Sequence, residues 1–379
     1  MKAFFSILAI SLCANFALFA ADGVSDKNLI SFPNAILENE ILLLEFLPTS
    51  LGRLNRILHK PSGVELLLPR TSWQVVVDPV LFIKNKTNAM GCCEFFWGSN
   101  HGQFDGQCEI ISHDKEKMVF NSDSYGVLGV KLKRQVVLPT DCSSFSFESV
   151  VTLKEGQRFS LRPWFNVVPV DHERSFLRVP LRGGVKENSL GACHYADASH
   201  VGTGQPGFLP PARNWMATVY PDQQLIFAIR LPDKELFPDG SFYTWWGMLT
   251  DGKKCKTMDV IYNAKQLEPG ENYPFSIKFM IFSGLTNIRE LAGNTAVDCT
   301  INNKDGQSEI EMRFAASCYL PEGEFKLKIN GETTHKIQMP ALRPGNTFAC
   351  SFACPTLAEK YEIGGILPDG TEFTLLDAE

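Results

Sequence analysis

From residue 39 onward the sequence consists mainly of short apolar runs and alternating apolar and polar residues, a pattern typical of β-strands. Gly, Pro, Asn and Asp separate these runs and mark turns. Helical periodicity is scarce, and only a short helix around 287–291 is predicted. The expected strands are 41–46, 73–83, 117–121, 127–138, 145–153, 159–168, 215–220, 225–231, 242–248, 258–262 and 273–282. Strands without alternating helices exclude a doubly wound α/β sheet and favour stacked antiparallel sheets.

The first 21 residues have the pattern of an export signal. Lys2 supplies the positive start, residues 3–19 are apolar, and Ala20-Ala21 offers a cleavage site. An uncleaved membrane anchor is the alternative, but the apolar stretch is marginal against the roughly 20 residues that a spanning helix needs. No second long apolar segment follows. We therefore expect a secreted or periplasmic protein with no integral membrane segment after cleavage.

The length of 379 residues corresponds to two or three folding units, at roughly 150 residues per domain. After Gly293 the sequence changes to a small unit of alternating strands with tight turns at Asn330-Gly331 and Asp369-Gly370. We therefore predict a main β unit over 22–294 and a small C-terminal β unit over 295–379.

Cysteine usage predicts disulfides and no metal site. Removing Cys13 with the signal leaves ten of the 11 cysteines, an even number in an exported chain. Nearness in sequence favours Cys92 or Cys93 with Cys108, and pairing among the last four cysteines, although connectivity does not follow from sequence. Buried thiols are the alternative. No Cys or His pairs have the spacing of a zinc site.

Charge and motifs exclude several functions. The net charge of -6 argues against a nucleic-acid partner, because such proteins carry basic surfaces that neutralise phosphates. The sequence has no Walker loop, no dinucleotide fingerprint in a βαβ context and no Gly-x-Ser-x-Gly elbow. We therefore expect no cofactor.

Three stretches of the sequence contain motifs in a telling order. An opening hairpin over 36–69 contains Leu51-Gly52-Arg53-Leu54 and Gly63-Val64-Glu65-Leu66-Leu67. A later strand contains Pro163-Trp164-Phe165-Asn166, and the turn Leu267-Glu268-Pro269-Gly270-Glu271 precedes the strand 273–282. In this order they resemble the opening hairpin, the strand that lines the sugar cleft and the turn before the last strand of galactose-mutarotase-like proteins. The resemblance implies an antiparallel β-supersandwich, followed here by a small β-sandwich-like domain, with a mono- or oligosaccharide bound in a concave cleft.

The resemblance also implies which residues to examine for catalysis. Mutarotation needs a general base and a general acid on either side of one sugar, which are a Glu and a His in this family. His101, in the stretch His101-Gly102-Gln103-Phe104-Asp105-Gly106, resembles a family His-Gly-Gly loop. The usual pair is absent, because Pro163-Trp164 and residues 243–246 stand at the other two expected positions. Acid and base groups would then have to come from other positions: Asp171, His172 and Glu173 just after the cleft strand, His194 and His200, or Asp259. A charged turn such as 171–174 is more often solvated.

Sugar recognition is expected from aromatic rings, which match the apolar faces of pyranoses, combined with amide, carboxylate and guanidinium groups. A tryptophan can also lie in the hydrophobic core and contact no sugar, and this alternative applies to each one proposed here. The predicted binding residues are Trp97, Asp105, Arg162, Trp164, Asn166, Arg213, Trp215, Trp245 and Trp246.

Three function classes remain open. The protein is a carbohydrate-active enzyme (an epimerase, lyase or hydrolase), a non-catalytic carbohydrate-binding protein, or a structural or interaction protein with a degenerate cleft. The missing acid and base favour the second class over simple epimerisation, and the group of tryptophans argues against the third.

Overall fold

The computed structural model describes residues 29–30, 34–68, 73–74, 92–96, 108–125, 128–172, 174–180, 195–197, 207–209, 212–231, 241–244, 246–248, 254–304, 307–355 and 361–375. Every regular element within these ranges is a β-strand, which confirms the predicted all-β class. No helix with the length and hydrophobicity of a membrane span occurs in this part of the chain. The short helix predicted around 287–291 is wrong, because β25 (Glu290–Ala292) pairs there with β26 (Thr295–Lys304).

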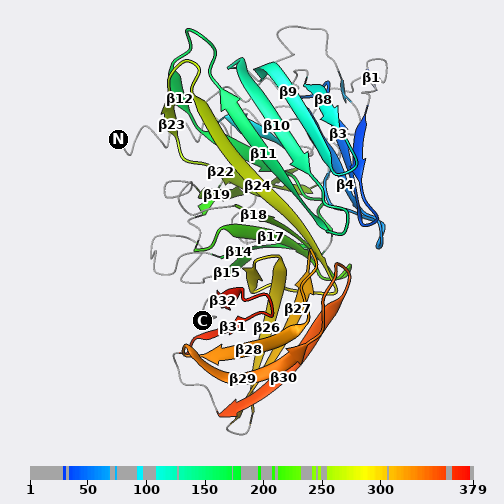
Figure 1. Ribbon diagram of the computed structural model, residues 1–379, viewed down its shortest axis with the longest axis vertical. Helices are drawn as coiled ribbons and strands as arrows, with labels where there is room; N and C mark the ends of the chain where they lie inside the picture. Colours follow the sequence, from blue (N-terminus) through cyan, green and yellow to red (C-terminus); the bar gives the residue numbers. More distant parts are fainter. Residues whose placement is uncertain are drawn as a thin grey trace.

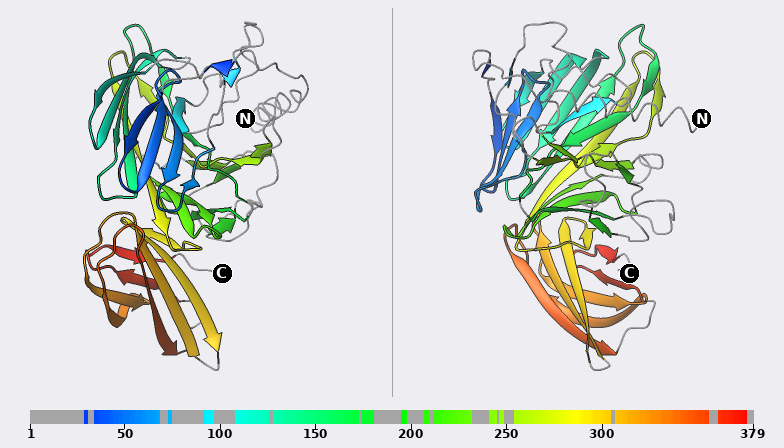
Figure 2. Two further views of the ribbon diagram at one scale, coloured as in Figure 1. Left: turned by 90° about the vertical axis from the view of Figure 1, so that its right-hand side faces the viewer. Right: turned by 180° about the vertical axis from the view of Figure 1, so that it is seen from behind.

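The described residues of the main body form two nine-stranded antiparallel sheets, packed face to face (Figures 1 and 2). Sheet 1 has the order β15-β14-β17-β18-β24-β11-β10-β9-β8, and sheet 2 has the order β16-β19-β22-β13-β7-β4-β3-β2, with β5 paired to β4. The strands of sheet 1 are β8 (Glu109–His113), β9 (Lys117–Tyr125), β10 (Val130–Val137), β11 (Ser144–Thr152), β14 (Phe176–Pro180), β15 (Tyr195–Asp197), β17 (Trp215–Tyr220), β18 (Leu225–Arg230) and β24 (Asn272–Ser283). Those of sheet 2 are β2 (Ala35–Glu38), β3 (Leu42–Leu47), β4 (Arg53–His59), β5 (Val64–Glu65), β7 (Cys92–Phe96), β13 (Pro163–Val167), β16 (Gly207–Leu209), β19 (Ser241–Thr244) and β22 (Asp259–Ile261).

Three two-stranded ribbons accompany the large sheets within the described ranges. They are β1 (Leu29–Ile30) with β6 (Trp73–Gln74), β12 (Phe159–Leu161) with β23 (Lys265–Leu267), and β20 (Trp246–Met248) with β21 (Lys254–Lys256).

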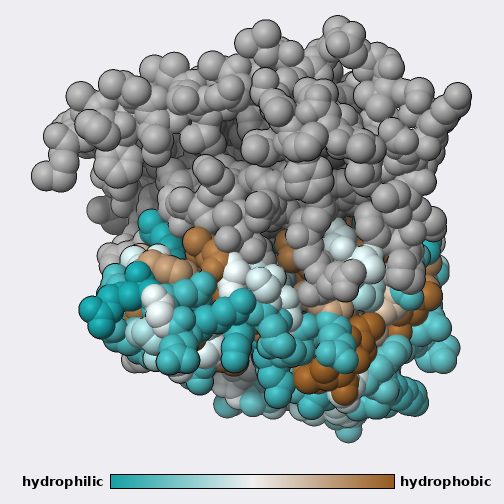
Figure 3. Space-filling model, turned by 90° about the horizontal axis from the view of Figure 1, so that it is seen from above, coloured by the Kyte–Doolittle hydropathy of each residue, from teal (hydrophilic) through white to brown (hydrophobic). Residues whose placement is uncertain are grey.

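The core between the two sheets follows from alternation along the strands. Phe145 and Phe147 of β11 point inward, as do Phe279 of β24 and Phe165 of β13. The rings of Phe145 and Phe279 stack with centroids 4.6 Å apart. Each buried side chain of this size stabilises the fold by about 1.5–3 kcal/mol. Alternation also directs the polar side chains outward. They predominate on the described surface seen from above, where a few apolar patches interrupt them (Figure 3).

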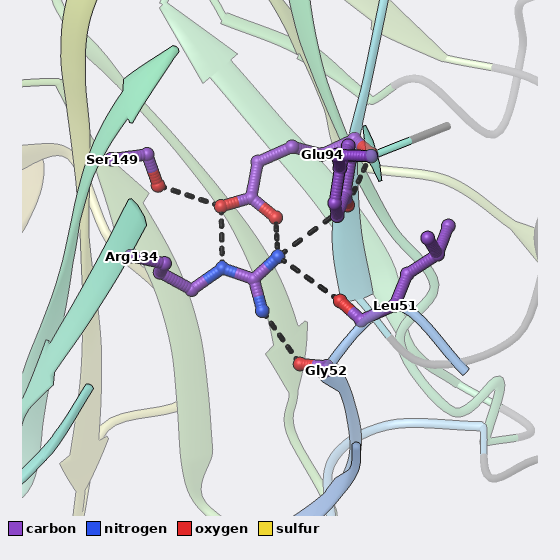
Figure 4. A network of polar contacts seen from close by, with 6 residues as sticks. Leu51, Gly52, Glu94, Arg134 and Ser149 are labelled. Atoms are coloured by element: carbon purple, nitrogen blue, oxygen red, sulfur yellow. Dashed lines mark hydrogen bonds and ion pairs between the residues drawn. The ribbon is translucent and has the colours of Figure 1, made fainter. Parts of the chain in front are cut away.

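A buried ion pair joins the two sheets through the core (Figure 4). Arg134 of β10 and Glu94 of β7 are both fully buried, and Arg134 Nε donates to Glu94 Oε1 at 2.6 Å. Ser149 donates to the same carboxylate oxygen, and Arg134 Nη1 donates to the carbonyl of Gly52. A Cβ at Gly52, where φ is 62°, would lie 3.0 Å from Phe120. Position 52 therefore requires glycine, because only a residue without a side chain lets the turn come close enough for its carbonyl to accept from Arg134.

The C-terminal residues form two further four-stranded sheets with a core of their own, at one end of the long axis (Figure 1). One contains β25, β26, β27 (Gln307–Ala316) and β30 (Thr347–Pro355); the other contains β28 (Gly323–Ile329), β29 (Glu332–Met339), β31 (Ile363–Ile366) and β32 (Glu372–Thr374). This C-terminal unit packs on the outer side of sheet 1, where Trp215, Ala217 and Phe282 meet Leu291 and Ala296. The boundary near residue 295 stays a prediction, and the pairing of the C-terminal sheets begins at Glu290.

One disulfide, Cys142 to Cys318, links the main body to the C-terminal unit in the described part of the chain. The backbone N–H of Ser143 donates to the carbonyl of Ser317 at 2.7 Å, so the fold itself brings the two cysteines together. Both pairings predicted from nearness in sequence are therefore wrong. Cys92 and Cys108 carry buried thiols, as do Cys299, Cys350 and Cys354.

Candidate functional site

The candidate site lies on the outer face of sheet 2, the face that points away from sheet 1. In β13, Phe165 and Val167 belong to the core between the sheets. Successive side chains of a strand point to opposite faces, so Trp164 and Asn166 lie on the outer face. Trp164 remains partly exposed, whereas Asn166 is buried at 6% exposure.

Asp259 of the neighbouring strand β22 belongs to the same face. Its neighbours Met258 and Val260 are both in the core between the sheets, so the carboxyl group points outward. Its Oδ1 accepts a hydrogen bond from Asn166 Nδ2 at 2.9 Å and one from the backbone N–H of Val167 at 3.3 Å. The carboxyl group thereby joins β13 to β22 on the outer face.

The environment of Asp259 changes its acidity. The residue is 1% exposed, and this burial raises the pKa of the carboxyl group well above its usual value. Hydrogen bonds from Thr257, from the backbone N–H of Val167 and from Asn166 lower the pKa and oppose this effect without reversing it. A carboxyl group held in this way can keep its proton at a higher pH than an exposed aspartate, and it can then donate as well as accept hydrogen bonds.

An aromatic pair stands next to this carboxyl group. Tyr243 of β19 lies opposite Asp259 in the strand pairing, and its ring meets that of Trp164 edge to face, with centroids 6.4 Å apart and an interplanar angle of 80°. Trp164 and Tyr243 thus come from the two strands that flank Asp259 in sheet 2. We name Trp164, Asn166, Tyr243, Thr257 and Asp259 the Asp259 cluster. It combines aromatic, amide, hydroxyl and carboxyl groups on one face.

Arg162 lies two residues before Trp164, immediately before β13. It is partly exposed, and its Nε donates to the carbonyl of Tyr262 at 2.9 Å. Of the predicted binding residues, Arg162, Trp164 and Asn166 therefore lie along one segment of sheet 2.

Arg213 and Trp215 are elsewhere, at the contact with the C-terminal unit. Trp215 is 1% exposed, and its Nε1 donates to Glu290 Oε1 at 2.8 Å. Arg213 Nε donates to Glu290 Oε2 at 3.0 Å, and Arg213 Nη2 donates to the carbonyl of Thr374. Alternation in β17 points Trp215 away from sheet 2, and the C-terminal unit covers it. The structure does not bring these two residues to the Asp259 cluster.

His172 also lies away from the Asp259 cluster. Its ring contacts Tyr220 edge to face with centroids 5.3 Å apart, and Tyr220 belongs to the core between the sheets. The other predicted catalytic and binding positions, His101, Glu173, Trp97, Asp105 and Trp245, lie outside the described residues, as do His194, His200 and the side chain of Trp246. These positions stay predictions.

Sequence reasoning missed Thr257 and gave Asp259 only a secondary place. The available signal was the position of Asp259 within the apolar run Met258-Asp259-Val260-Ile261. A carboxylate inside a buried strand is rare unless it is paired. No group of three or more His, Cys, Asp or Glu residues with the arrangement of a metal site occurs among the described residues.

No protein-family model and no curated protein matches this sequence. Among solved structures, the Slr1438 protein from Synechocystis sp. PCC 6803 matches 70% of this chain and 100% of its own at 15% identity, with a TM-score of 0.51. A galactose mutarotase related enzyme from Lactobacillus acidophilus matches 67% of this chain and 98% of its own at 11% identity and a TM-score of 0.48. A galactose mutarotase-like protein from Lactobacillus casei ATCC 334 matches 66% of this chain and 100% of its own at 13% identity and a TM-score of 0.46.

At these identities the likeness concerns the fold alone. The match to the Synechocystis structure spans about the length of the main body, and the two opposed nine-stranded antiparallel sheets agree with the architecture that the sequence motifs predict. The main body therefore has an antiparallel β-supersandwich fold like that of the Synechocystis structure, to which a small C-terminal β unit is attached.

Proposed function

We propose that this protein binds a carbohydrate at the Asp259 cluster and that it does so outside the cytoplasm. The observation that carries the proposal is the partly exposed Trp164 beside Asn166 and Asp259 on the outer face of sheet 2. An indole face matches the apolar C–H face of a pyranose, while amide and carboxyl groups match its hydroxyls. Arg162 adds a charged group at the edge of the same segment.

Binding is favoured over catalysis by the residue types of the three strands that carry the site. Strands β13, β19 and β22 together contain one carboxyl group, Asp259, and no histidine. Mutarotation needs two proton-transfer groups that face each other across one sugar. The described His172 contacts the core between the sheets instead. We therefore propose a carbohydrate-binding role without the usual acid and base.

The Cys142–Cys318 disulfide supports export, because such bonds persist in oxidising compartments. It agrees with the signal pattern of residues 1–21, and we propose that the mature chain is secreted or periplasmic.

A glycan-array screen of the chain without residues 1–21, followed by calorimetry on the strongest ligand, tests the proposal. The Trp164→Ala variant should weaken binding roughly 5- to 150-fold, the equivalent of ~1–3 kcal/mol. Tyr319→Ala is the matched control, since Tyr319 is an exposed aromatic residue of the C-terminal unit, and it should bind as the wild type does. A lack of binding to any glycan contradicts the proposal. So does unchanged affinity of a folded Trp164→Ala variant.

An NMR anomer-exchange measurement on the bound sugar separates binding from catalysis. With no acid and base pair on the three strands, the protein should leave the exchange rate of the free sugar unchanged. If the protein accelerates anomer exchange, and the Asp259→Asn variant accelerates it equally, the catalytic groups lie away from the Asp259 cluster.

A further inference from the structure

A second, partly buried polar cluster lies where the chain passes from β13 of sheet 2 to β14 of sheet 1. Asp171 Oδ1 accepts hydrogen bonds from Lys256 Nζ at 2.8 Å and from the hydroxyl of Ser175 at 2.9 Å. The Lys256 side chain is 1% exposed, and its Nζ also donates to the Ser175 hydroxyl at 2.7 Å. This arrangement fixes the connection against the segment that leads into β22.

Two polar atoms next to this ion pair are buried and have no hydrogen-bond partner among the described residues. They are His172 Nε2 and the hydroxyl oxygen of Tyr220. The two rings are in direct contact, edge to face, with centroids 5.3 Å apart. Leaving a buried polar atom without a hydrogen bond is costly, and native proteins contain few such atoms.

We propose that His172 Nε2 and the Tyr220 hydroxyl bind one buried water molecule, which bridges them to Asp171. The water accepts a hydrogen bond from the Tyr220 O–H and donates to His172 Nε2. Its second hydrogen goes to Asp171 Oδ2, since Oδ1 already receives Lys256 and Ser175.

The chemistry of the groups favours a water molecule. Buried waters make two to four hydrogen bonds to otherwise unpaired groups, and the proposed water makes three. Its partners adjoin one another, because Asp171 precedes His172 in the chain and the His172 ring contacts the Tyr220 ring. Burial, and to a smaller extent the charge of Asp171, raises the pKa of Tyr220.

Two adjacent residues connect the water site to the Asp259 cluster. Lys256 and Thr257 are adjacent, and Thr257 hydrogen-bonds Asp259 on the outer face, while Lys256 pairs with Asp171 on the other side. The inference does not depend on the proposed carbohydrate binding, because it concerns only the hydration of the folded chain.

Thermal unfolding of Tyr220→Phe, compared with Tyr262→Phe, tests this inference. Both tyrosines are fully buried, and the Tyr262 hydroxyl donates to the carbonyl of Ser276 at 2.6 Å. If a water pairs with the Tyr220 hydroxyl, Tyr220→Phe should lower the Tm by a shift comparable to that of Tyr262→Phe. An unchanged or higher Tm for Tyr220→Phe would mean that the hydroxyl is truly unpaired, and it overturns the proposal.

A high-resolution crystal structure of the wild type gives a direct reading. A solvent peak within hydrogen-bond distance of both His172 Nε2 and the Tyr220 hydroxyl is expected, and it should disappear or move in Tyr220→Phe. Well-ordered rings with no solvent peak between them overturn the proposal.

Discussion

Asn166 Nδ2 lies 2.9 Å from Asp259 Oδ1 and donates to it across the β13–β22 pair, on the outer face of sheet 2. A carboxyl group that is 1% exposed is thus stabilised mainly by neutral donors. Neutral donors offset burial only in part, and the pKa of Asp259 remains raised. The site is therefore expected to depend on pH.

Asp259→Asn should change the pH dependence of stability in a defined direction. The folded chain holds the Asp259 proton more tightly than the unfolded chain, so this residue's contribution is present below the unfolded pKa and is lost as pH rises through the folded pKa. Asparagine keeps an oxygen acceptor and does not titrate. The stability of Asp259→Asn relative to wild type should therefore increase between pH 4 and pH 8 in urea unfolding experiments.

Glu116→Gln provides a control of the opposite sign. The pKa of Glu116 is lowered, mainly by hydrogen bonds from Thr140, so its contribution is present above the unfolded pKa and is lost on acidification. This variant should lose stability relative to wild type as pH rises from 3 to 6. A pH-independent difference between wild type and Asp259→Asn contradicts the burial of an ionisable carboxyl group at this position.

The parts of the fold that follow strand alternation were predictable from the sequence. Residues 145–153 and 273–282 were expected as strands, and they form β11 and most of β24, which pair with each other. The short helix around 287–291 was not found, because pairing with β26 determines the conformation of Glu290–Ala292. Propensity over five residues is weak compared with tertiary pairing.

The candidate site was predictable only where residues share one strand. Trp164 and Asn166 were chosen together, and the structure places them on one face. Trp215 was chosen by the same criterion, yet the face of β17 that carries it packs against the C-terminal unit. A sequence pattern gives the two faces of a strand but not which of them another unit covers. The Cys142–Cys318 pair was unpredictable for the same reason, since 176 positions separate the two cysteines.

Glu94→Gln and Arg134→Met should each destabilise the protein strongly. Either change leaves an unpaired polar or charged group in the core, because both side chains are fully buried and are bonded to each other. Removing one member of a buried ion pair costs about 3–5 kcal/mol. Urea unfolding of the two single variants and of the double variant, which carries both Glu94→Gln and Arg134→Met, measures the coupling energy between the two side chains. The double variant should lose less than the sum of the two single losses, and additive losses contradict the pairing.

Reduction of Cys142–Cys318 should lower stability markedly, since the bond closes a loop over 176 positions. Long loops gain the most from closure, and a loss of roughly 2–5 kcal/mol is expected. The Tm of wild type should fall on addition of a thiol reductant, and Cys142→Ser should show the lower Tm with or without it. Cys350→Ser is the control, because Cys350 carries a buried thiol outside the disulfide, and this variant should keep the full response to reductant.

Glu290→Ala should weaken the attachment of the C-terminal unit to sheet 1. The Glu290 side chain is 5% exposed, and it accepts hydrogen bonds from both Trp215 and Arg213. Its removal leaves the Trp215 N–H buried without an acceptor and removes a charge partner from Arg213, at a cost of about 2–4 kcal/mol.

Glu311→Ala is the matched control for Glu290→Ala, since Glu311 pairs with Arg313 on the exposed side of β27. Exposed ion pairs contribute about 0–1 kcal/mol, because water screens them. Intrinsic fluorescence during urea unfolding follows both variants, since Trp215 lies at the contact that Glu290 stabilises. Equal losses for the two variants contradict the central place of Glu290 in this contact. A larger loss for Glu290→Ala, with an earlier change in indole emission, is the expected result.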